Sequence, residues 1–206
     1  MRNKSVLTLT LLLLLSGYAH AQDEAASPSS IDSAAVARKL SSKYPVERRT
    51  AAEELARLAA TEHRRLTEGY RAQEKDERVR LALDWALYRM GKDESLFPLV
   101  RSLGEKKYAA QTVAYLKQLE TPEPLYVFLE RVNGNTRIRL LEVLASVGDR
   151  GTLEKIKPYT ESLDPGIADA AKFAEREINI RLEEQPAAEP KRQRKVSSAD
   201  DPEPPR

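Results

Sequence analysis

The chain has 206 residues, with 34 lysines and arginines against 32 aspartates and glutamates, and it has no cysteine. A near-neutral chain with charges of both signs interspersed lacks the basic surface that nucleic acid or an anionic membrane usually demands, so we expect neither as a partner. Without cysteine there are no disulfides and no thiolate metal ligands, and the fold must be held by packing.

The first 21 residues have the order of parts typical of a secretory signal peptide. Arg2 and Lys4 precede an apolar run from Val6 to Leu15, and small residues follow at Ala19 and Ala21. The apolar run is about half the roughly 20 residues that a membrane-spanning helix needs. We therefore predict cleavage after Ala21 and a mature protein in the periplasm or outside the cell, with no membrane span. A retained amphipathic or membrane anchor is the alternative.

The middle of the chain, residues 31–184, has helical periodicity with short breaks at Gly, Pro or Asp. It follows a small, polar segment at 22–30, which we expect to be a disordered linker. The breaks recur, because Gly91 and Gly148 lie 57 residues apart and each follows a similar helix end. Half of this interval is a unit of about 28 to 29 residues. Five helical pairs fit this unit, near 31–60, 61–91, 93–119, 122–148 and 152–183.

Individual residues predict where helices begin and end. In the third pair, Asp93 is expected to cap a first helix that ends at Gly104, and the second helix is expected to begin near Lys106. Prolines 45, 124 and 165 stand at other predicted helix starts, where a first-turn proline loses no hydrogen bond.

Several segments resemble the HEAT-repeat (armadillo-like) family. Asp76–Ala82 and Asp164–Ala170 resemble the pattern in which Asp-Pro, then Val or Ile, then Ala open the second helix of a repeat. Gly148-Asp149 resembles the turn between HEAT units, and Leu96–Val100 resembles their proline-containing first helix. The pattern is absent at Glu105–Tyr108. The resemblance implies an all-α fold, a right-handed α-solenoid of about five HEAT-like helical hairpins.

The same fold follows from packing. A helical pair this short cannot bury its apolar face alone and must stack on its neighbours to form a continuous core. A closed helical bundle is the alternative, although a bundle does not require a repeated unit.

Few residues of the chain are suited to catalysis. The predicted mature chain has one histidine, His63, which lies between charged neighbours and is expected to be solvated. Adjacent carboxylates such as Glu53 and Glu54 point in different directions on a helix, so we expect surface charges there. With no cysteine and no second histidine, the usual transition-metal sites are not expected. We predict no catalytic residues, no metal and no cofactor.

Two sets of residues are candidates for binding. Leu81, Trp85 and Tyr88 form a second apolar stripe on the helix predicted from residue 76 to 90. Either this helix packs on both its own unit and the next, or Trp85 and Tyr88 stay partly exposed on a concave ridge and anchor a partner, as aromatic residues often do. Arg137 and Arg139 open the second helix of the fourth unit and either recognise an acidic peptide or are simply solvated.

The tail at 185–206 is rich in charged residues and proline, a composition that predicts disorder. Its basic cluster at 191–195 suggests a solubilising segment, or contact with anionic envelope polymers or lipids. The sequence as a whole predicts a non-catalytic scaffold of the cell envelope or extracellular space that binds a protein or peptide. The alternatives are a structural envelope protein tethered through this tail and a HEAT-like lyase-type enzyme.

Overall fold

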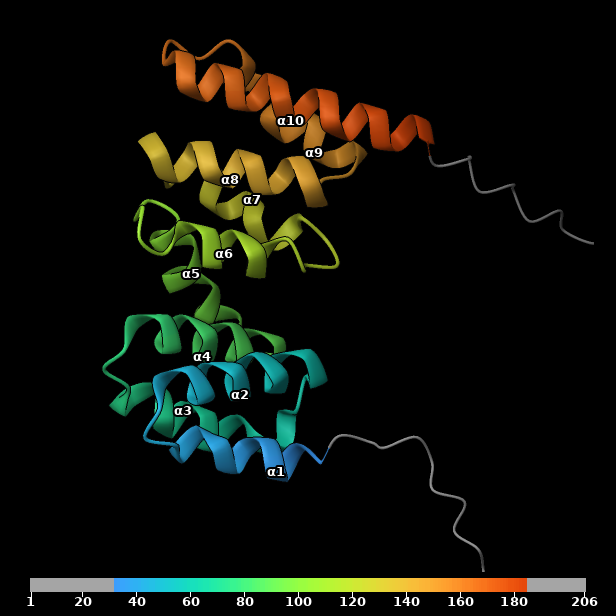
Figure 1. Ribbon diagram of the computed structural model, residues 1–206. Helices are drawn as coiled ribbons and strands as arrows, with labels where there is room; N and C mark the ends of the chain where they lie inside the picture. Colours follow the sequence, from blue (N-terminus) through green and yellow to red (C-terminus); the bar gives the residue numbers. More distant parts are fainter. Residues whose placement is uncertain (1–31, 185–206) are drawn as a thin grey trace, which may run out of the picture. The chain divides into compact units, whose positions relative to one another are not determined.

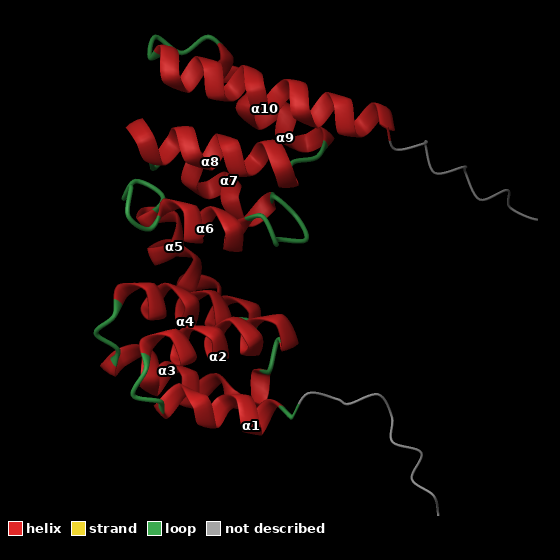
Figure 2. Ribbon diagram, in the orientation of Figure 1, coloured by secondary structure: helices red, strands yellow, loops and turns green. Residues whose placement is uncertain are grey.

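The computed structural model describes residues 32–184, and every regular element in that range is a helix (Figures 1 and 2). The prediction of an all-α fold is therefore confirmed for this part of the chain. The predicted signal peptide, the linker at 22–30 and the tail at 185–206 lie outside the described residues.

The helices begin and end close to the predicted boundaries. In chain order they are α1 (Ser33–Arg38), the 3-10 turn η1 (Lys39–Ser41), α2 (Pro45–Leu58), η2 (Thr61–His63), α3 (Arg64–Gln73), α4 (Glu77–Arg89), η3 (Asp93–Ser95), α5 (Leu96–Ser102), α6 (Ala109–Leu116), α7 (Glu123–Leu129), α8 (Gly134–Val147), α9 (Arg150–Thr160) and α10 (Pro165–Glu184). Each of the five predicted ranges holds two of these α-helices.

Aspartate side chains start the second helices where the sequence predicted them. The carboxylate of Asp76 accepts hydrogen bonds from the first free amides of α4, those of Arg78 and Val79. Asp164 Oδ1 accepts from the amides of Gly166 and Ile167 at the start of α10, at 2.9 and 3.4 Å. These bonds satisfy donors that have no partner within the helix itself, which fixes the residue at which each helix begins.

The third pair departs from the prediction at both of its helix starts. Asp93 does not cap α5, because it lies inside the η3 turn, whose N-cap residue Lys92 makes no side-chain capping bond. The second helix begins at Ala109 rather than near Lys106, and its N-cap residue Tyr108 has no side-chain capping bond either. Without an aspartate to capture the free amides, the chain forms turns over Glu105–Tyr108 and α6 is short.

The second helices contact one another in succession, α2 with α4, α4 with α6, α6 with α8, and α8 with α10, and each also packs on the first helix of its own pair (Figure 1). The contacts of α2 with α4 and of α8 with α10 extend along most of these helices, whereas α6 approaches its neighbours over short stretches. Side chains rather than close helix-to-helix approach therefore hold the middle of this series.

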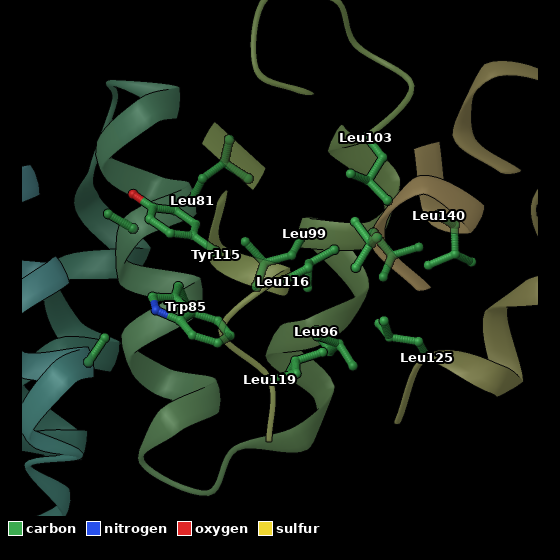
Figure 3. Close-up of a cluster of buried hydrophobic side chains, with 14 of the residues drawn as sticks. Leu81, Trp85, Leu96, Leu99, Leu103, Tyr115, Leu116, Leu119, Leu125 and Leu140 are labelled. Atoms are coloured by element: carbon green, nitrogen blue, oxygen red, sulfur yellow. The ribbon is translucent and has the colours of Figure 1, made fainter. Parts of the chain in front are cut away.

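The indole of Trp85 lies beside Tyr115 at one side of the buried cluster in that middle region (Figure 3). Every residue of α4 from Leu81 to Leu87 is buried, and Trp85 is 2% exposed. Its ring stacks on Tyr115 of α6, with centroids 5.9 Å apart and planes 2° from parallel, and on Tyr88 of α4 at 5.7 Å. Leucines from α5, α6, α7 and α8 continue the same core away from this stack.

The hydroxyl of Tyr115 reaches past α4 to α2. It donates a hydrogen bond to Glu53 Oε1 at 2.6 Å and accepts one from Gln111 Nε2 at 2.7 Å. The Gln111 amide also donates to the carbonyl oxygen of Arg78, at 2.8 Å. Three successive pairs are thus joined by one tyrosine and its hydrogen bonds.

A buried ion pair joins α3 to α4. Arg71 Nε donates to Asp84 Oδ1 at 2.7 Å, and Asp84 is 4% exposed. Burial raises the pKa of Asp84 above its usual value, although the hydrogen bond and charge of Arg71 act in the opposite direction. The carboxylate is therefore tolerated in its ionised form because Arg71 accompanies it.

We expect Trp85→Ala to lower the free energy of unfolding by about 3–5 kcal/mol, because it removes a large side chain enclosed on all sides. Urea denaturation followed by circular dichroism measures this loss. Phe97→Ala is the control, since Phe97 is 51% exposed, and it should cost about 1 kcal/mol or less. Equal losses in the two variants would show that Trp85 is not part of a packed core.

Arg71→Ala should cost about 3 kcal/mol at neutral pH, because the buried Asp84 carboxylate is left without its partner. Losing Arg71 raises the pKa of Asp84 further, so the Asp84 carboxyl of the variant binds a proton more tightly in the folded state than in the unfolded state. Lowering the pH from about 7 towards about 4 protonates this carboxyl and removes the unpaired buried charge. The loss in free energy of unfolding, relative to the wild type, should therefore shrink over this range. Urea denaturation of both proteins at several pH values in this range measures the difference in their free energies of unfolding. Adding Asp84→Asn should abolish the pH dependence of the deficit, and a deficit that stays constant in Arg71→Ala itself would contradict this account.

Candidate functional site

A groove of about 920 Å³ lies between α8 and α10, with Lys117 at one side. Its apolar surface comes from Ile138 and Ala145 of α8 and from Ala170 and Phe173 of α10. The two alanines are buried, but Phe173 is 41% exposed. We call this hollow the α8–α10 groove.

Small residues set the depth of the groove. A Cβ atom on Gly166 would lie 3.0 Å from Ile138 Cδ1, so glycine here allows α10 to begin close against α8. At the other end of α8, a Cβ atom on Gly148 would lie 2.7 Å from Ile178 Cδ1 and 2.5 Å from the carbonyl oxygen of Leu144. Larger residues at these two positions would push α8 and α10 apart.

Arg181 fixes the same two helices to each other. Its guanidinium donates to the carbonyl oxygens of Ala145 and Gly148, at 2.9 and 2.5 Å, at the C-terminal end of α8. These carbonyls have no partner inside the helix, and a positive charge at this end also complements the helix dipole. The charge of Arg181 is therefore already engaged in the fold.

The remaining charges of the groove are mostly acidic. Glu142 faces Arg139 at 3.5 Å. Asp169 and Glu177 also line the groove and form no ion pair with another residue of the described range. On α10 these two carboxylates stand four residues before and four residues after Phe173, so the three side chains form a row along one helix face. The row offers an aromatic ring between two negative charges.

The prediction that Trp85 stays partly exposed is wrong. Tyr115 covers the second face of α4, so Trp85 is enclosed and has almost no surface for a partner. Tyr88 is half-buried against Trp85 and lines a separate hollow of about 390 Å³ with Leu119. The alternative interpretation, in which this helix packs on both its own pair and the next, agrees with the contacts of α4.

The two predicted arginines lie on α8, away from the aromatic stack. Arg137 is half-buried, donates from Nε to the Leu129 carbonyl at 3.1 Å, and lies 5.1 Å from the centroid of the Tyr159 ring. Arg139 lies beside the α8–α10 groove through its contact with Glu142. The structure therefore does not bring the four predicted binding residues into one site.

Phe173 did not stand out in the sequence, although a signal was present. The buried face of α10 contains Ile167, Ala171, Ala174 and Ile178, which recur at helical spacing. Phe173 stands one position outside this stripe. Phe173 lies beside a buried stripe on α10, and no further pair among residues 32–184 follows to cover it.

His63 is less exposed than expected. Its side chain is 18% exposed, and Nε2 lies 3.1 Å from Ser33 Oγ, so the ring joins the η2 turn to α1. Within residues 32–184, no three histidines or carboxylates lie close enough together to hold a metal ion. The helices of the same range also include none with the length and apolar character needed to cross a membrane.

Arg181→Ala should lower the free energy of unfolding by about 2 kcal/mol, because two carbonyl oxygens lose a charged donor. Amide hydrogen exchange should also accelerate at the C-terminal end of α8. Arg176→Ala is the matched control on the same helix, since Arg176 is exposed, lies 5.7 Å from the centroid of the Phe173 ring, and forms no ion pair within residues 32–184. If the two variants lose the same free energy of unfolding and show the same amide exchange rates in α8, Arg181 does not hold α8 to α10.

The comparison with known proteins assigns no family to the chain. No family model matches it, and no curated protein matches it. The resemblance to HEAT repeats therefore stays a prediction from the sequence, and the function has to be inferred from the site itself.

Proposed function

We propose that the protein is a non-catalytic scaffold that binds an extended segment of a protein or peptide in the α8–α10 groove. The observation that carries this proposal is the row of Asp169, Phe173 and Glu177, in which a partly exposed aromatic ring lies between two carboxylates without ion-pair partners in the described range. Exposed aromatic anchors with charged neighbours are typical of binding surfaces.

The spacing of this row suits an extended peptide. Four residues of an α-helix span about 6 Å, and two residues of an extended chain span about 6.6 Å. Alternate side chains of a peptide that runs along α10 would therefore meet Asp169, Phe173 and Glu177 in turn. The matching sequence is a basic residue, any residue, an apolar residue, any residue, and a second basic residue.

The arrangement of helices supports a scaffold of the kind that the sequence predicts. Contacts pass from each second helix to the next, and five pairs follow one another in the described range. We propose that they form a right-handed HEAT-like α-solenoid, in which the second helices provide the binding ridge. With the export signal predicted in residues 1–21, the partner belongs to the periplasm or the extracellular space.

A displayed library of random short peptides tests this function. The protein, purified from Gln22 onwards, should enrich peptides with the alternating basic–apolar–basic pattern. Phe173→Glu should weaken their binding at least about tenfold, because the central apolar residue of the peptide loses its aromatic partner and would have to desolvate a carboxylate. Leu66→Glu is the matched control: Leu66 is 45% exposed on α3, outside the groove, and this change should leave binding intact.

Reversing the charges gives the sharpest outcome. The double variant Asp169→Lys, Glu177→Lys should enrich acidic–apolar–acidic peptides instead, provided that circular dichroism shows an unchanged fold. The proposal fails if the wild type enriches no peptide, if Phe173→Glu binds as the wild type does, or if charge reversal leaves the peptide preference unchanged.

A further inference from the structure

A second hollow, of about 690 Å³, lies where the connection from α3 to α4 meets α5. Three arginines from three successive helices line it: Arg71 from α3, Arg80 from α4 and Arg101 from α5. Phe97 and Tyr108 add aromatic surface. We call it the arginine cavity. It shares no lining residue with the α8–α10 groove, so the two sites are independent.

The guanidinium groups of this cavity use only part of their hydrogen-bonding capacity. Each has five N–H donors. Arg71 donates from Nε to Asp84, and Arg80 donates from Nη1 to Glu77 at 2.9 Å. Arg80 Nε is buried and has no acceptor among the described residues, and Arg101 forms no ion pair or side-chain hydrogen bond within them. The exposed guanidinium of Arg101 therefore keeps its donors for a molecule that supplies acceptors.

The carboxylates around the cavity do not cancel its positive charge. Asp84 and Glu77 are each engaged by one arginine, which leaves Arg101 uncompensated on that side. Glu105 lines the cavity from the α5–α6 connection and is exposed to solvent. Two residues further along the chain, the Lys107 ammonium lies 5.1 Å from the centroid of the Tyr108 ring, which itself lines the cavity. The lining of the cavity therefore includes three arginines against two carboxylates.

The aromatic surface is held in place before any ligand arrives. Phe97 is 51% exposed, yet its ring packs edge-on against Phe128, with centroids 4.9 Å apart. A ring that is already fixed loses little conformational freedom when a ligand covers it. The cavity thus combines an unengaged guanidinium with a rigid aromatic surface.

We infer that the arginine cavity binds a small organic anion in which a carboxylate or phosphate group is attached to an aromatic or apolar group. The planar guanidinium of Arg101 can donate two parallel hydrogen bonds to such an oxyanion. The apolar part of the ligand packs against Phe97. This ligand site lies on α3, α4 and α5. It is a second binding site, because the proposed peptide groove is formed by α8 and α10.

Phenyl phosphate and phenylacetate are the probes, and benzyl alcohol is the neutral compound with the same ring. Titrations of the purified protein, followed by amide chemical shifts, should show saturable binding of at least one of the two anions at the cavity, weaker at higher salt because the contact is ionic. The anion that binds more tightly identifies the head group. Benzyl alcohol should bind at least about tenfold more weakly than that anion.

Arg101→Gln provides the decisive variant, because Arg101 is exposed and its loss should not disturb the fold. It should weaken anion binding at least about tenfold. Arg131→Gln is the matched control, since Arg131 is also exposed and follows the short helix α7. The inference is overturned if neither anion binds saturably, if benzyl alcohol binds equally well, or if Arg101→Gln binds as tightly as the wild type.

Discussion

The near-parallel stack of Tyr115 on Trp85 is the contact on which the middle of the described chain depends. α6 has only eight residues and no side-chain cap at its start, so it offers little surface to α4. The stack fills that contact with two large aromatic rings, and the hydrogen bond from Tyr115 to Glu53 extends it to α2. The helices on either side instead pack along most of their length.

Much of this architecture could be predicted, because it depends on local chemistry. An aspartate that accepts amide hydrogen bonds fixes where α4 and α10 begin, and Pro165 supplies the helical φ angle for the first turn of α10. Gly148 is needed because Ile178 approaches it closely. Each of these features involves residues that are close in the sequence or that lie on adjacent helices. The prediction was wrong at α5 and α6, where no such residue is present.

The exposure of individual side chains could not be predicted in the same way. Periodicity shows which residues share a helix face, but it does not show what covers that face. The residue one repeat after Trp85 is Ala114, so the repeat gave no reason to expect an aromatic contact there. The ring that covers Trp85 belongs instead to the next residue, Tyr115. Phe173 is the opposite case, because it is partly exposed on the last described helix.

These differences in coverage decide which aromatic residues remain free to bind. An aromatic side chain in the middle of a stacked series is recruited to join neighbouring pairs, as Trp85 is, so its mutation reports on stability. Within residues 32–184, no helical pair follows α10, where Phe173 lies. At α10 the helix is also fixed to α8 by Arg181, so Phe173 is presented from a rigid surface, and a peptide that binds there need not first order the helices that form its groove. In the described range, the place of a helix among its neighbours therefore separates the buried Trp85 from the partly exposed Phe173.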